Sequence, residues 1–172
     1  MQLQFQAQTK GKLIDVNPRS EKRGAHDLVP AVDLRLQVDT TNGALSQLDP
    51  ELCEWLYRQG MQETLPGVDA VADMTALRFP ELGQPLHWAG ESKGYALTFD
   101  LGISPDSDIQ LHDCKLHKVT LTVKEGGTVQ LTFSVSCAEG VTREQIGELG
   151  TRVQHDVFFV LSKVEPATSD AG

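Results

Sequence analysis

The sequence predicts an α+β domain made mainly of antiparallel β-strands, in which two pseudo-repeated strand–strand–helix–strand units surround a common core. One observation is an ungapped self-match at an offset of 97 positions, and residues 12–16 also match residues 115–119. The ungapped match places Leu34, Leu36, Val38, Gly43, Glu51 and Leu52 opposite Leu131, Phe133, Val135, Gly140, Glu148 and Leu149. A second observation is the alternation of apolar and polar residues, which is typical of half-buried strands. Since alternation makes any two strands align, only the glycine pair and the helix match argue specifically for a duplication.

The length of 172 residues suits a single domain. We expect this domain to span residues 1–163, with one half at 1–102, the other at 108–163, and a flexible tail at 164–172. The chain has 24 acidic and 15 basic residues, and its net charge of −9 favours a basic protein partner over nucleic acid. Residues 1–23 hold five Lys or Arg and two Asp or Glu, so their charge is +3 and the remaining residues carry −12.

Three cysteines without a signal-peptide pattern predict a reducing compartment, which we take to be the cytoplasm. An odd cysteine count also argues against a disulfide framework. Apolar runs such as residues 157–161 are far shorter than the roughly 20 residues that span a bilayer. We therefore expect no membrane segment.

The first strand is expected at residues 2–16. Leu3, Phe5 and Ala7 alternate with glutamines, and the pattern changes phase near residues 10–11, as a β-bulge would cause. A charged loop is expected over residues 17–27. The returning strand should follow at residues 32–38, where every second residue is apolar.

A helix is expected from Pro50 to Gly60. Asp49 can cap its first turn, proline suits the first helical position, and glycine suits a left-handed residue at the C-terminal end. The expected buried face of this helix consists of Leu52, Trp55 and Leu56. Residues 61–85 follow no regular period and read as an irregular apolar excursion, after which a strand resumes at residues 95–101.

The second half begins with a predicted β-hairpin. Residues 116–123 and 129–135 alternate on either side of a turn at residues 124–127, which contains two glycines. Thr142 and Gln145 have the spacing of a capping box for a short helix that Gly150 would end, and a last strand is expected at residues 153–161. The expected core includes Leu36, Phe133, Val135 and Phe159.

The sequence shows no constellation typical of catalysis. It contains neither a nucleophile elbow nor a phosphate-binding glycine loop. His112, Cys114 and His117 are the densest group of metal-ligating residue types, but on a strand His117 would project away from the other two. Ordinary strand residues are therefore favoured over metal ligands, and Asp106 and Asp108 favour a turn over a cation site.

We accordingly predict a protein that is not an enzyme, with no catalytic residues, no metal site and no cofactor. A metal-dependent hydrolase is an alternative, and it would require the His112 region to meet distant acidic residues.

Two segments are candidate binding sites. Arg19, Lys22 and Arg23 lie at a basic hairpin tip of the kind that contacts phosphate or an acidic partner, although two nearby acidic residues and the lack of aromatic residues favour a simple solvated loop. Leu77 and Phe79 belong to the irregular apolar segment, which either docks on a partner or covers the sheet.

Several short segments carry a resemblance to a known family. These are residues 17–24 (Asn-Pro-Arg-Ser-Glu-Lys-Arg-Gly), 29–33, 77–80 (Leu-Arg-Phe-Pro), 114–115 and 124–129. Together they resemble a family of tailed-phage and prophage accessory proteins, often encoded near recombination genes. The resemblance covers most of the chain, roughly residues 3–161, but its motifs are structural turns. It implies a phage origin and the cytoplasm of an infected or lysogenic bacterial host, and it assigns no activity and no functional residues.

We therefore expect a non-enzymatic phage accessory protein that binds a host or phage DNA-processing or defence protein through its acidic body. The alternative is a single-stranded nucleic-acid-binding or recombination accessory protein that uses the basic hairpin tip. Salt dependence separates the two, because phosphate contacts release counterions and weaken steeply as salt rises. The oligomeric state, and whether a small ligand lies between the halves, stay open.

Overall fold

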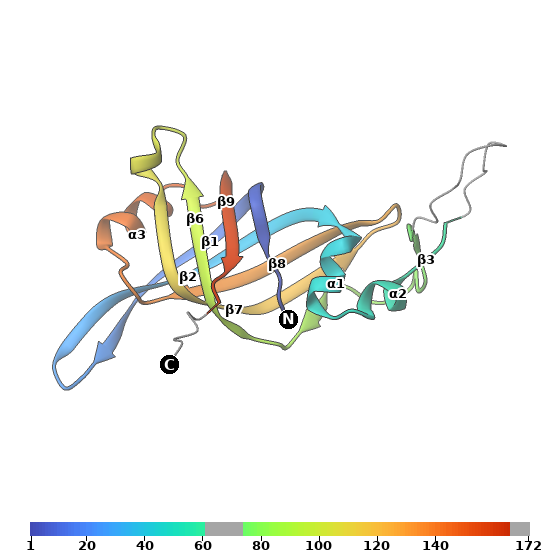
Figure 1. The fold of residues 1–172 in the computed structure, drawn as a ribbon, viewed down its shortest axis with the longest axis horizontal. Coiled ribbons are helices and arrows are strands. Elements are labelled where there is room, and N and C mark those ends of the chain that lie inside the picture. The colour runs from blue at the N-terminus through green and yellow to red at the C-terminus, as the bar shows by residue number, and fades with distance from the viewer. Residues whose placement is uncertain (61–73, 166–172) are drawn as a thin grey trace, which may run out of the picture.

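A closed antiparallel β-barrel is the main feature of the computed structural model (Figure 1). The structure describes residues 1–60 and 74–165, and within them six strands follow the hydrogen-bonded order β1–β2–β8–β7–β6–β9 before β9 pairs again with β1. The prediction of a mainly antiparallel β fold is confirmed. The α+β label is not, because the helices among the described residues are short and form no layer of their own.

The barrel strands differ in length. Their bounds are β1 Phe5–Arg23, β2 Asp27–Thr41, β6 Ser92–Asp100, β7 Ile109–Val123, β8 Thr128–Cys137 and β9 Asp156–Lys163. The short strand β5 (Leu86–Trp88) precedes β6 along the same edge of β7, while β8 occupies the other edge. A separate pair is formed by β3 (Tyr57–Arg58) and β4 (Ala76–Leu77). The helical elements are η1 Asn42–Ala44, α1 Leu45–Leu48, α2 Leu52–Leu56, η2 Pro105–Ser107 and α3 Arg143–Gly150.

The barrel interior is filled by apolar side chains that alternate along the strands. Phe5, Phe133 and Phe159 form a cluster of three rings, in which the Phe5 centroid is 6.0 Å from that of Phe133 and 5.7 Å from that of Phe159. Gly11 permits this packing, because a Cβ there would approach the Phe159 ring to 2.8 Å. The four predicted core residues are at most 1% exposed, so that prediction is confirmed.

Strand β7 keeps its apolar side chains inside by means of two irregularities. Asp113 and Lys118 both have a φ of 51°, and the register of β7 shifts beside each of them. A bulge of this kind reverses which residues face inward. Leu116 and Val119 are therefore both buried, although strict alternation would place them on opposite faces.

The predicted loop at residues 17–27 is wrong. These residues continue β1 and begin β2, and the two strands pair as far as Arg23 and Asp27, so that the turn spans only residues 24–26. The hairpin extends beyond the barrel (Figure 1). On the β1 side its residues, such as Arg19, Glu21 and Lys22, are polar on both faces because neither face covers the core. This composition hid the outer part of β1 from a pattern based on alternation.

The predicted helix from Pro50 to Gly60 is also wrong in its extent. Helix α2 ends at Leu56, and Tyr57 is extended, with a φ of −121° and a ψ of 152°. The carboxylate of Asp49 accepts a hydrogen bond from the Glu51 N–H at 2.8 Å, but α2 has no side-chain cap. Since the helix has a single turn, Leu56 is buried while Trp55 is 64% exposed.

The elements at the C-terminal end agree better with the sequence. Thr142 and Gln145 form the expected capping box, and α3 ends at Gly150. Strand β9 starts three residues later than expected, because Gln154 adopts a φ of 69° within a turn. Of the predicted irregular segment and tail, residues 61–73 and 166–172 lie outside the described residues. None of the helices in the described ranges is long and apolar enough to cross a membrane.

Candidate functional site

A cluster of large exposed apolar side chains lies beside the barrel. Trp55 on α2 and Phe79 after β4 are 64% and 44% exposed, and their ring centroids are 5.6 Å apart. Leu82, which is 39% exposed, follows Phe79 in a turn closed by a hydrogen bond from its N–H to the Phe79 carbonyl. We call Trp55, Phe79 and Leu82 the aromatic ledge.

Arg78 holds the two halves of the ledge together. Its backbone N–H donates to the Leu56 carbonyl at 2.9 Å, and its guanidinium donates to the carbonyls of Glu54 at 3.0 Å and Tyr57 at 3.4 Å. The Glu54 and Leu56 carbonyls belong to the last residues of α2 and the Tyr57 carbonyl follows directly, in the region where helix carbonyls lack partners within the helix. The contacts fix the segment that carries Phe79 against the helix that carries Trp55.

Tyr57 fastens the ledge to the barrel. Its side chain is fully buried, and its hydroxyl donates to the Lys124 carbonyl at 2.7 Å and accepts from the Lys124 N–H at 3.1 Å. Burial raises the pKa of the Tyr57 phenol, which therefore stays protonated and keeps donating. Leu77 pairs with Tyr57 between β3 and β4, and its N–H donates to the Glu125 carboxylate at 3.1 Å.

Most of the charged residues close in sequence to the ledge are acidic. Glu51 and Glu54 lie on and just before α2, and Glu81 lies between Phe79 and Leu82; all three are exposed. Arg58 on β3 is an exposed cation in the same region, whereas the Arg78 guanidinium is engaged with backbone carbonyls. The exposed charged residues that flank the ledge in sequence are thus mainly carboxylates.

The sequence identified one of the three ledge residues, Phe79, and missed Trp55 and Leu82. Phe79 is exposed, as a docking residue must be, but Leu77 is half-buried in the β3–β4 pair. Trp55 was assigned to a buried helix face. Helical periodicity places Trp55 on the same face as Leu52 and Leu56, so it predicts that all three are buried. This prediction fails because the helix ends after one turn.

The basic residues of the β1–β2 hairpin are engaged with carboxylates. The Arg19 Nε donates to both carboxylate oxygens of Asp33 at 3.0 Å, and its guanidinium also pairs with Glu21. Arg23 pairs with Glu139 beyond the end of β8. The hydrogen bond with Glu21 raises the pKa of Arg19 despite its partial desolvation.

Lys22 is exposed opposite Leu28 and has no ion pair with any residue that the structure describes.

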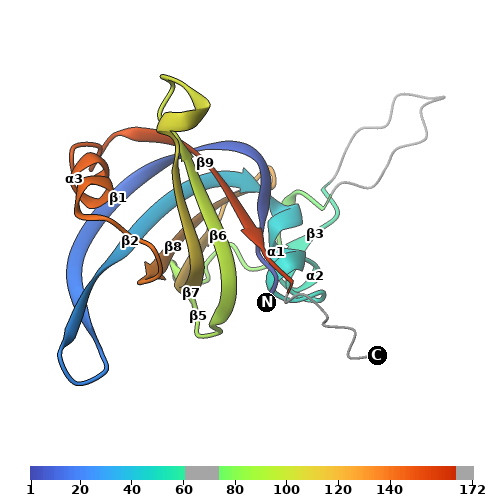
Figure 2. The same cartoon turned by 60° about the vertical axis from the view of Figure 1, so that its left-hand side comes forward.

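The two predicted binding segments are not brought together. The hairpin and the β3–β4 pair lie on opposite sides of the barrel in both views (Figures 1 and 2).

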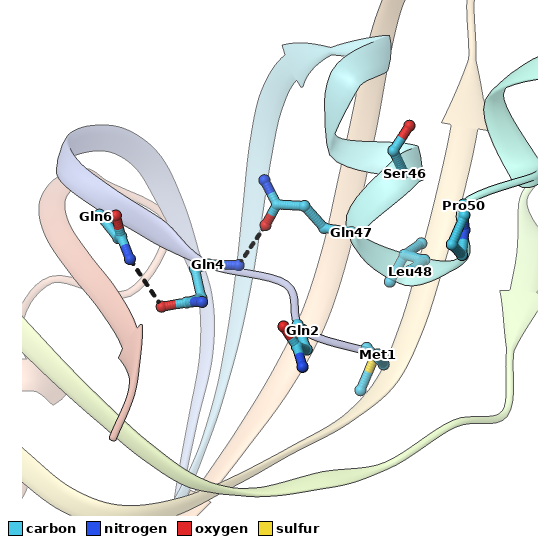
Figure 3. A pocket seen from close by; sticks show the side chains of 8 residues that line it. All are labelled: Met1, Gln2, Gln4, Gln6, Ser46, Gln47, Leu48 and Pro50. Atoms are coloured by element: carbon cyan, nitrogen blue, oxygen red, sulfur yellow. Dashed lines mark hydrogen bonds between the residues drawn. The ribbon is translucent and has the colours of Figure 1, made fainter. Parts of the chain in front are cut away.

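A groove of about 640 Å³ separates the N-terminal segment from α1 (Figure 3). It is lined by Met1, Gln2, Gln4, Gln6, Ser46, Gln47, Leu48 and Pro50, so its described lining contains no ionisable side chain. The Gln47 side chain accepts from the Gln4 N–H at 2.7 Å, and the Gln6 amide donates to the Gln4 side chain at 3.1 Å. These glutamines mainly hold the N-terminal segment against α1.

The candidate metal ligands are dispersed. His112 is exposed, Cys114 is buried in the barrel, and His117 forms a 2.7 Å hydrogen bond with the Ser136 hydroxyl. Across residues 1–60 and 74–165, no three His, Cys, Asp or Glu side chains group closely enough to hold a metal ion.

Comparison of the chain with protein-family models, with curated proteins and with solved structures found no match. The aromatic ledge, the acidic charge and the barrel-anchoring contacts of Tyr57 are therefore the basis for a functional assignment.

Proposed function

We propose that this chain is a non-enzymatic phage accessory protein that binds a host or phage DNA-processing or defence protein through the aromatic ledge. The observation that carries the proposal is the contact between Trp55 and Phe79, two rings that stay exposed although their backbone is fastened to the barrel. Tryptophan is among the residue types that contribute most at interfaces, and aromatic residues in general are enriched there. A pre-ordered pair loses little conformational entropy when a partner binds.

The charge of the chain supports a basic partner. The net charge is −9, and exposed carboxylates flank the ledge in sequence at Glu51, Glu54 and Glu81. Opposite charge accelerates association at low salt, and the apolar contacts then slow dissociation. We therefore expect the partner to present an apolar side chain bordered by Lys or Arg.

The test is affinity capture from an infected or lysogenic host, followed by titration of the captured protein. We expect the double variant Trp55→Ala/Phe79→Ala to weaken binding by about thirtyfold or more, which corresponds to ~2 kcal/mol for a hot-spot pair. Leu28→Ala is the matched control, because Leu28 is an exposed apolar residue on the distant hairpin. Equal capture by the wild type and the double variant would exclude the ledge as the binding site.

We also propose that the barrel consists of two related halves, as the self-match predicts. If β1 exchanges with β7, β2 with β8, and β6 with β9, each hydrogen-bonded neighbour in the barrel is again a neighbour. Leu36 pairs with Phe133, the residue 97 positions later, and the pairs Leu34–Val135 and Val38–Leu131 exchange with each other. A superposition of the two halves that required another strand order or another buried face would contradict the duplication.

A further inference from the structure

We propose that Cys114 and Cys137 are an oxidation site, at which hydrogen peroxide joins the thiols of two neighbouring strands in a reversible disulfide. Cys114 lies on β7, Cys137 is the last residue of β8, and both are free thiols in this structure. The third cysteine, Cys53, lies on helix α2. Neither strand cysteine belongs to the aromatic ledge, so the proposal is independent of the proposed protein-binding function.

The first argument is the register of the two strands. The ladder between β7 and β8 pairs Lys115 with Ser136. A further bridge pairs His112 with Glu139 in the same register, so the two cysteines lie between these pairs and directly opposite each other. Opposite residues on antiparallel strands have Cα atoms about 4.5 or 5.5 Å apart. Since a disulfide needs Cα atoms roughly 4.4 to 6.8 Å apart, the strands are already close enough for the bond.

The second argument is the contact between the two side chains. Both belong to the barrel core, and their sulfur atoms lie 3.7 Å (Cys114) and 3.2 Å (Cys137) from the same oxygen, the His112 carbonyl. A hydrogen bond between the thiols lowers the pKa of Cys137 and raises the pKa of Cys114. Because the thiolate is the nucleophile, Cys137 is the first of the two to react with an oxidant.

The reaction needs the peroxide as its only oxidant. The Cys137 sulfur attacks one peroxide oxygen, the O–O bond breaks, and the leaving hydroxide forms water with the thiol proton. The Cys114 sulfur then attacks the sulfur of the Cys137 sulfenic acid, the S–O bond breaks, and a second water leaves with the Cys114 proton. The two thiols thus lose two electrons and two protons, and the peroxide is reduced to two molecules of water.

The position of Cys137 at the end of a strand gives the oxidant access to a buried thiol. Cys137 is 1% exposed and Cys114 is 0% exposed, so neither is reached while the barrel is fully closed. The ends of elements open locally at a lower free energy than the whole fold. Hydrogen peroxide is little larger than water and can react with Cys137 during such an opening. Closing of the strand end then returns the oxidised sulfur to Cys114.

The test is mass spectrometry of the full chain after treatment with hydrogen peroxide and then alkylation in denaturant. We expect the folded wild type to lose the mass of two hydrogen atoms and two of its three alkylation sites. Proteolysis without reductant should release one cross-linked peptide pair, which contains Cys114 and Cys137. Treatment with dithiothreitol should restore both alkylation sites, because a disulfide is reducible whereas a sulfinic acid is not.

The matched control is the same chain oxidised in denaturing urea, where no strand register selects the partner. We expect the unfolded chain to give a mixture of all three possible cysteine pairings, and we expect folded Cys53→Ser to form the same disulfide as the wild type. Cys114→Ala should stop at the Cys137 sulfenic acid, which dimedone traps. The proposal is overturned if the folded wild type forms no cross-link, if its cross-link includes Cys53, or if it gives the same mixture as the unfolded chain.

Discussion

Two fully buried tyrosines show how the same hydroxyl group can have opposite energetic effects. The Tyr57 hydroxyl forms two hydrogen bonds with the backbone of Lys124, whereas the Tyr95 hydroxyl has no partner among the described residues. We expect Tyr57→Phe to lower the free energy of unfolding by about 1 to 2 kcal/mol, and Tyr95→Phe to leave it within about 0.5 kcal/mol or to raise it.

Urea denaturation of the two variants measures this difference directly. Since both substitutions remove one oxygen from a buried ring, each serves as the control for the other. Equal losses at the two positions would mean that the Tyr95 hydroxyl also has a hydrogen-bond partner in the folded protein.

Asp33 makes part of the stability dependent on pH. Burial alone would raise its pKa, but hydrogen bonds from Ser136 and Arg19 outweigh burial and hold the pKa below 3.8. A carboxylate with a lowered pKa in the folded state stabilises the fold above its unfolded pKa, and this stabilisation is lost as the pH falls through the folded pKa.

We therefore expect Asp33→Asn to reduce stability at pH 7 and to show a smaller further loss below about pH 4 than the wild type does. Denaturation midpoints at neutral and acidic pH measure the difference. Arg19→Ala should have a similar effect, because it removes a partner of the same carboxylate. An unchanged acid dependence in Asp33→Asn would show that the ion pair does not stabilise the hairpin.

At the scale of single elements, the bulges of β7 reduce the stability of the fold, because they hold residues with side chains in the left-handed backbone region. Lys118 has a φ of 51°, in the left-handed region that costs a residue with a side chain about 1 kcal/mol relative to glycine. We expect Lys118→Gly to stabilise the protein by about 0.5 to 1 kcal/mol, and Lys118→Ala to give no such gain. Thermal melts of both variants separate backbone strain from the loss of the lysine side chain, and equal melting temperatures would contradict the strain.

The elements that the sequence predicted well are those with local signals. The β7–β8 hairpin has two glycines in its turn, and α3 has the capping box of Thr142 and Gln145, so a few neighbouring residues specify each element. The outer part of β1 carries polar residues on both faces, and α2 ends where Tyr57 turns away to bond with the distant Lys124. Neither cause can be seen in a short window of sequence.

At the scale of the whole molecule, barrel closure depends on pairings that no local pattern identifies. Strand β2 pairs with β8, and β9 pairs with both β1 and β6, so each contact joins residues that are far apart in the chain. Alternation predicted that these segments are strands but not which strands are neighbours. For the same reason the sequence identified Phe79 but did not predict its contact with Trp55, because the two rings come from separate elements.

The distribution of charge over the whole molecule leads to the last prediction. The net charge is −9, and two of the three cations of the hairpin tip, Arg19 and Arg23, are already paired with carboxylates. A protein gains binding free energy on single-stranded nucleic acid when its unpaired Lys and Arg side chains displace counterions from the phosphates. Arginines that are already paired with carboxylates contribute little to this counterion release. We therefore expect no binding of a single-stranded oligonucleotide at about 150 mM salt.

Fluorescence anisotropy with a labelled oligonucleotide measures this, and the variant Arg19→Ala/Lys22→Ala/Arg23→Ala should behave like the wild type. The same variant should retain the captured partner protein, whereas charge reversal of Glu51 and Glu54 should slow association with a basic partner, chiefly at low salt. Oligonucleotide binding by the wild type that the triple substitution abolishes would favour the nucleic-acid-binding alternative. The hairpin ion pairs would then have to open on binding, and a steep salt dependence would accompany that step.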